Sequence, residues 1–106
     1  MKNIKTKLIA GSLALLAAST SASAEFIDNV QVTQLGAYEA MTLHYVWLSS
    51  GTSAECAASS GNPVLFFNDA QPGGKGMLTM LISAVVNKRN VSIRTQGCNI
   101  TEIYLK

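Results

Sequence analysis

The N-terminal segment constrains this chain most, because it has the form of an export signal that leaves only a small domain behind. Three lysines lie within the first seven residues, residues 8–18 are apolar, and Ala22-Ser23-Ala24 is a small-residue cleavage motif. Removal of residues 1–24 leaves residues 25–106, a single domain of 82 residues. We therefore expect an exported protein, periplasmic or secreted. We expect no stable membrane anchor, because the apolar run is about half as long as a membrane span.

The charge of the chain belongs largely to this signal. The whole sequence carries a formal net charge of +2, but residues 25–106 hold five Lys and Arg against six Asp and Glu, which gives −1. Binding to nucleic acid depends on basic side chains that neutralise phosphates. The expected domain is near neutral, so we expect no nucleic-acid partner.

The chain has two cysteines, Cys56 and Cys98, and both fall in the expected domain. Small exported domains have marginal cores and are often stapled by disulfides, so we predict a Cys56–Cys98 disulfide. A metal or redox site is a poor alternative, because there is no C-x-x-C motif and the only histidine is His44. We expect neither a metal nor a cofactor.

Alternation of apolar and polar residues predicts five short strands, and one apolar segment with helical spacing predicts a helix at 75–87. Asn87 is expected to take the left-handed conformation that ends this helix. The intervening stretches are rich in Gly, Ser and Asn and are expected to be turns, including a break at Gly36 and a long loop at 49–62. The expected strands are 26–34, 40–48, 63–68, 90–96 and 101–105.

The order of these elements indicates the fold class. Three strands, a helix and two further strands fit a mainly β (α+β) protein, a small five-stranded OB-fold-like barrel with one helix between the third and fourth strands. The alternative is an open antiparallel sheet with one packed helix.

Motifs in the second half of the chain carry a family resemblance. A helical segment, Met77-Leu78-Thr79-Met80-Leu81, follows a strand that ends near Asn68-Asp69. A strand at 91–94, the turn Gly97-Cys98 and a closing apolar segment at 100–105 come next. On these motifs the chain resembles a group of small exported bacterial proteins of unknown function with a single disulfide.

The layout is also similar to that of the receptor-binding (B) subunits of AB-type pentameric toxins, of the subtilase cytotoxin kind. That resemblance implies an OB fold, binding to cell-surface sugars and assembly of identical chains into a ring. It assigns no individual binding residue, because Glu25-Phe26-Ile27 contains no serine to match the one with which the toxin subunits contact sugar.

The candidate binding chemistry is an aromatic platform with nearby polar side chains, as a carbohydrate would require. Aromatic rings can pack against the apolar face of a sugar, and amides can hydrogen-bond its hydroxyl groups. The candidate residues are Tyr38, Tyr45, Trp47, Asn68, Asp69 and Gln71. Each also has a structural interpretation, with the aromatic rings in packing and the Asn-Asp pair in a turn.

No catalytic constellation is expected. His44 alternates with apolar residues on an expected strand and is interpreted as structural, the acidic residues are scattered, and Gly73-Gly74-Lys75-Gly76 lacks the spacing of a phosphate-binding loop. We therefore expect a binding module for a glycan or a receptor, not an enzyme, with self-assembly as an open possibility. The alternative is a monomeric periplasmic interaction or stress protein without a ligand pocket, whose partner is an envelope protein.

Overall fold

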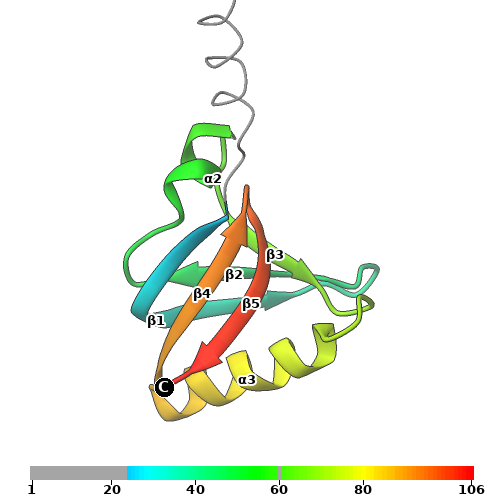
Figure 1. Ribbon diagram of the computed structural model, residues 1–106. Helices are drawn as coiled ribbons and strands as arrows, with labels where there is room; N and C mark the ends of the chain where they lie inside the picture. The colour runs from blue at the N-terminus through cyan, green and yellow to red at the C-terminus, as the bar shows by residue number, and fades with distance from the viewer. Residues whose placement is uncertain (1–23, 60) are drawn as a thin grey trace, which may run out of the picture.

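The computed structural model describes residues 24–59 and 61–106, so residues 1–23 of the expected signal lie outside the described part of the chain. Within these residues five strands and two helices follow one another, and Figure 1 shows their arrangement. In chain order they are β1 (Glu25–Ala37), β2 (Leu43–Leu48), α2 (Ala54–Ser59), β3 (Leu65–Asn68), α3 (Gly74–Asn87), β4 (Asn90–Gln96) and β5 (Asn99–Leu105).

The five strands are hydrogen-bonded in a closed ring with the order β1-β2-β3-β5-β4. All neighbours are antiparallel except β3 and β5, which run parallel and pair at Phe66 and Asn99. This confirms the predicted mainly β fold with five strands and with α3 between the third and fourth. The alternative of an open sheet is wrong, because β1 pairs with both β2 and β4 and so closes the ring.

β1 can serve two neighbours because it is long and bent. Its first half pairs with β4 and its second half with β2, and register shifts occur between Ile27 and Val30 and between Val32 and Gln34. Such bulges bend a strand and increase its twist. The predicted break at Gly36 is wrong, because Gly36 lies within β1 and pairs with Tyr45.

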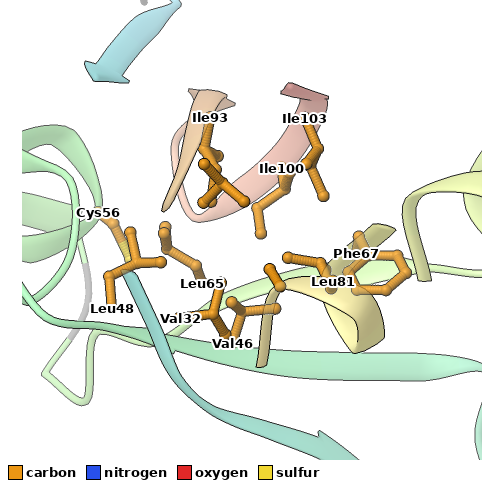
Figure 2. Close-up of a cluster of buried hydrophobic side chains, with 12 residues drawn as sticks. Val32, Val46, Leu48, Cys56, Leu65, Phe67, Leu81, Ile93, Ile100 and Ile103 are labelled. Carbon is orange, nitrogen blue, oxygen red and sulfur yellow. The ribbon is translucent and has the colours of Figure 1, made fainter. Parts of the chain in front are cut away.

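The hydrophobic core fills the inside of the ring, and side chains from every strand point into it (Figure 2). Figure 1 shows α3 across one end of the ring and α2 at the opposite end. Leu81 and Ala84 of α3 are buried, as is Cys56 of α2. The buried core residues are Val32, Val46, Leu48, Cys56, Leu65, Phe67, Leu81, Ala84, Val91, Ile93, Ile100 and Ile103.

Two local predictions about helices need correction. The expected loop at 49–62 contains α2, whose first amides donate to the carboxylate of Glu25, a partner far away in sequence. The left-handed residue after α3 is Lys88 (φ 53°), not Asn87. No helix among the described residues is long and apolar enough to span a membrane.

Strand ends differ from the expected ones where turns intervene. The second strand begins at Leu43, because residues 38–42 form a turn in which the amide of Met41 donates to the carbonyl of Tyr38. The third strand begins at Leu65, and the fifth begins two residues before the expected position, at Asn99. The fourth strand has the predicted bounds.

Candidate functional site

A groove of about 530 Å³ lies on the outer surface of β2 and β3. The alternation of β2 explains its lining, because His44, Val46 and Leu48 are buried inside the ring whereas Tyr45 and Trp47 lie between them on the other face. We call this the aromatic groove. Its lining residues are Tyr38, Met41, Tyr45, Trp47, Asn62, Val64, Phe66 and Cys98.

The rings of the aromatic groove support one another. Tyr38 and Tyr45 meet edge to face with centroids 5.4 Å apart, and Tyr45 meets Phe66 in the same manner at 6.2 Å. The Trp47 and Tyr38 rings lie over Gly36, at 3.5 and 3.7 Å from the position that a Cβ would take, which is ordinary van der Waals distance.

Two turns border the aromatic groove. The turn between β1 and β2 supplies Tyr38 and Met41, which are 47% and 44% exposed. The turn between β4 and β5 supplies Cys98, whose disulfide to Cys56 holds that turn against α2. The predicted Cys56–Cys98 disulfide is therefore confirmed. The amide of Gly97 also donates to the Glu55 carboxylate, at 2.6 Å.

A second hollow, of about 410 Å³, lies where β3, β5 and the start of α3 meet. Phe66 lines both hollows and so forms the wall between them. We call the second one the amide hollow, because three of its side chains are amides. Its lining residues are Leu43, Phe66, Asn68, Gln71, Pro72, Met77, Asn99, Ile100 and Thr101.

His44 of β2 contacts the end of β1 and the residue that follows β3. Its Nε2 lies 2.7 Å from Asp69 Oδ2 and its Nδ1 lies 3.2 Å from the carbonyl oxygen of Gly36. Both partners are acceptors, so both contacts are hydrogen bonds only when each ring nitrogen carries a hydrogen. The hydrogen bond from His44 holds the pKa of Asp69 below its ordinary value, burial opposes this shift, and Lys75 assists it.

The structure brings together only some of the candidate residues. Tyr38, Tyr45 and Trp47 line the aromatic groove, whereas Asn68 and Gln71 line the amide hollow. Asn68 also accepts a hydrogen bond from an amide within its turn, at 2.9 Å. Asp69 lines neither hollow and is engaged with His44. The three aromatic candidates therefore share one groove, whereas Asn68 and Asp69 make the structural contacts expected of turn residues.

Several lining residues were not among the sequence candidates. Phe66 belongs to a run of four apolar residues, in which strand alternation alone could have assigned it to the outer face. Met41 falls on the same alternating face as Tyr45 and Trp47 in the expected strand 40–48, so the same signal could have found it. Asn99 and Thr101 carry no comparable signal, because the parallel pairing of β3 with β5 places them.

A charged cluster occupies the outer surface of β1, β4 and β5. Arg94 lies over the Phe26 ring at 5.0 Å, and Arg94 Nε lies 3.3 Å from Glu102. The Tyr104 hydroxyl donates to Glu102, which lowers the pKa of that carboxyl and raises the pKa of Tyr104. The charged groups there are already paired with one another.

Comparison with known proteins does not assign a family. No family model matches the chain, and no curated protein matches it. Within residues 24–59 and 61–106, no group of three or more His, Cys, Asp or Glu side chains is placed to hold a metal ion. The geometry of the two hollows is therefore the basis for the functional proposal.

Proposed function

We propose that this protein is an exported binding module that recognises a glycan through the aromatic groove and performs no catalysis. The observation that carries the proposal is the position of the groove. Proteins with the OB fold bind oligosaccharides and oligonucleotides on the face of the second and third strands, between the loop that joins strands one and two and the loop that joins strands four and five. The aromatic groove lies on β2 and β3, and residues of both loops line it.

The lining favours sugar over nucleic acid. No Lys or Arg is among the described residues that line the aromatic groove or the amide hollow. Phosphate backbones are held by such cations. A sugar ring offers an apolar face to Tyr45 or Trp47 and hydroxyl groups to nearby amides, which suits the side chains present.

Export, and a role like that of a toxin receptor-binding subunit, are part of the same proposal. A disulfide is typical of proteins that fold in an oxidising compartment, which supports periplasmic or extracellular location. The single disulfide and the ring of five strands are compatible with the resemblance to toxin B subunits. Assembly of several copies is proposed on that resemblance alone, and light scattering of the purified domain tests it.

Trp47 makes the proposal directly testable. It is the only tryptophan of the chain, and it lines the aromatic groove. A glycan array probed with the disulfide-bonded domain should give hits, and each hit should change the intrinsic fluorescence on titration. Tyr38→Ala should weaken binding, whereas Phe26→Ala, an exposed aromatic outside the groove, should not.

Absence of any array hit would contradict the proposal. So would a hit whose affinity Tyr38→Ala leaves unchanged while the thermal unfolding of that variant matches the parent. In that case the alternative of a periplasmic interaction or stress protein gains support, and crosslinking in the envelope becomes the next experiment.

A further inference from the structure

We propose that the ligand is a neutral oligosaccharide, which crosses Phe66 and occupies the aromatic groove and the amide hollow together. This inference rests on the proposed function and adds the length and the charge of the ligand. A monosaccharide would fill one hollow, and an acidic glycan would find no cation in either.

The two hollows adjoin, which supports a ligand longer than one sugar ring. Phe66 lines both of them, so the two volumes, of about 530 and 410 Å³, adjoin at one aromatic side chain. Ligand sites commonly have volumes of roughly 300–1,000 Å³, so each hollow by itself has room for a small ligand and the two together have room for a longer one. A chain of sugar rings can extend from one hollow to the other over the Phe66 ring.

The side chains of the amide hollow suit hydroxyl groups. Gln71, Asn99 and Thr101 are exposed, and their amides and hydroxyl both donate and accept hydrogen bonds. Pro72 and Met77 give the hollow an apolar part beside them. A sugar ring has the same mixture of an apolar face and polar edges.

The absence of charge in the lining supports a neutral ligand. No described residue that lines either hollow is charged. Among the acids next in sequence to lining residues, Asp69 is engaged with His44 and Lys75, and Glu102 is engaged with Arg94. A carboxylate of an acidic sugar would lose water in these hollows without gaining a cationic partner, which is unfavourable.

The test is a titration of Trp47 fluorescence, checked by calorimetry, on the disulfide-bonded domain. The probes are malto-, cello- and chito-oligosaccharides from the monosaccharide to the tetrasaccharide, with lactose and 3′-sialyllactose as a matched neutral and acidic pair. We expect affinity for at least one neutral series to rise about tenfold or more with length, the equivalent of roughly 1.4 kcal/mol. We expect 3′-sialyllactose to bind no more tightly than lactose.

Variants separate the two hollows. Gln71→Ala and Asn99→Ala should remove the gain with length and leave monosaccharide affinity unchanged, whereas Tyr38→Ala should weaken every member of the series. Gln31→Ala is the matched control, because Gln31 is an exposed glutamine on β1 that lines neither hollow. It should bind like the parent.

The possible failures are distinguishable. Binding that depends on Tyr38 but does not increase with length overturns the two-hollow ligand and leaves the proposed function standing. Tighter binding of 3′-sialyllactose than of lactose overturns the neutral ligand. No fluorescence or heat change with any probe, together with an empty glycan array, overturns this inference and the proposed function together.

Discussion

Replacement of both cysteines by alanine is expected to remove a large part of the stability of this domain. The disulfide joins Cys56, which is fully buried in α2, to Cys98 in the turn between β4 and β5. The bond therefore fixes a segment that would otherwise be held to the ring by a few hydrogen bonds, including Ser53 Oγ to the carbonyl of Gly97 at 3.2 Å.

The magnitude follows from the length of the closed loop. The two cysteines are 42 residues apart. Loop-closure entropy for such a separation gives roughly 4 kcal/mol of stabilisation at 25 °C. A single core in a domain of this size supplies only about 3–5 kcal/mol. A loss of that size should lower the melting temperature by about 15–30 °C for a domain of this length.

The assay is urea unfolding of residues 25–106, followed by circular dichroism, in three forms: disulfide-bonded parent, reduced parent and Cys56→Ala/Cys98→Ala. The reduced parent and the double variant should unfold at similar urea concentrations, both far below the oxidised parent. The reduced parent controls for the packing that alanine alters at position 56, because it keeps both sulfur atoms.

A small effect would refute the reasoning. If the reduced parent and the double variant each lose less than about 1 kcal/mol, the loop entropy is not what stabilises this fold. The contacts of α2 with Glu25 and with the turn at Gly97 would then hold the segment without the covalent bond.

Three further predictions use the same urea assay. Gly74→Ala should lower the free energy of unfolding by about 1–3 kcal/mol, because the new Cβ would lie 2.5 Å from the carbonyl oxygen of Asn68. Gly76→Ala is the matched control, because a Cβ there meets open space, and its stability should be equal to or higher than that of the parent. Equal behaviour of the two variants would contradict the packing argument. Glu25→Gln should cost about 1 kcal/mol by weakening the hydrogen bonds to the first amides of α2, and an unchanged midpoint would count against that cap. The pKa of Asp69 is lowered in the folded protein. The stability that Asp69 contributes is therefore fully present above the ordinary pKa of about 3.9, and it is lost as pH falls through the lower pKa of the folded state. The free energy of unfolding should therefore decrease more steeply with acidification in the parent than in Asp69→Asn, and parallel curves would refute the assignment.

The sequence predicted the fold well, because the fold depends on periodic patterns. Alternation in Asn90–Gln96 indicated β4 with its observed bounds, and apolar residues at helical spacing indicated α3. The errors arose where a distant residue decides the local structure. Residues 54–59 fall in an expected loop because the residue that caps α2, Glu25 of β1, is about 30 residues away in sequence. A pattern read over neighbouring residues does not include it.

The site was less predictable for the same reason. Tyr45 and Trp47 could be paired from strand alternation alone, and Tyr38 joins them through the turn that follows β1. Asn68 and Gln71 are grouped with the aromatic residues in the sequence only because their side chains are of the type that binds sugar hydroxyl groups. The parallel pairing of β3 with β5 instead places them beside Asn99, on the other side of Phe66.

The six residues of β2 link the stability of this domain to its proposed recognition surface. Their alternation directs Val46 and Leu48 into the core and Tyr45 and Trp47 into the aromatic groove. His44 contacts the carbonyl of Gly36, the residue over which the Trp47 and Tyr38 rings lie. Binding sites are most effective when packing already holds their side chains in place. The core and the groove therefore depend on one strand, and a substitution that shifts its register would expose the core residues and bury the aromatic rings at once.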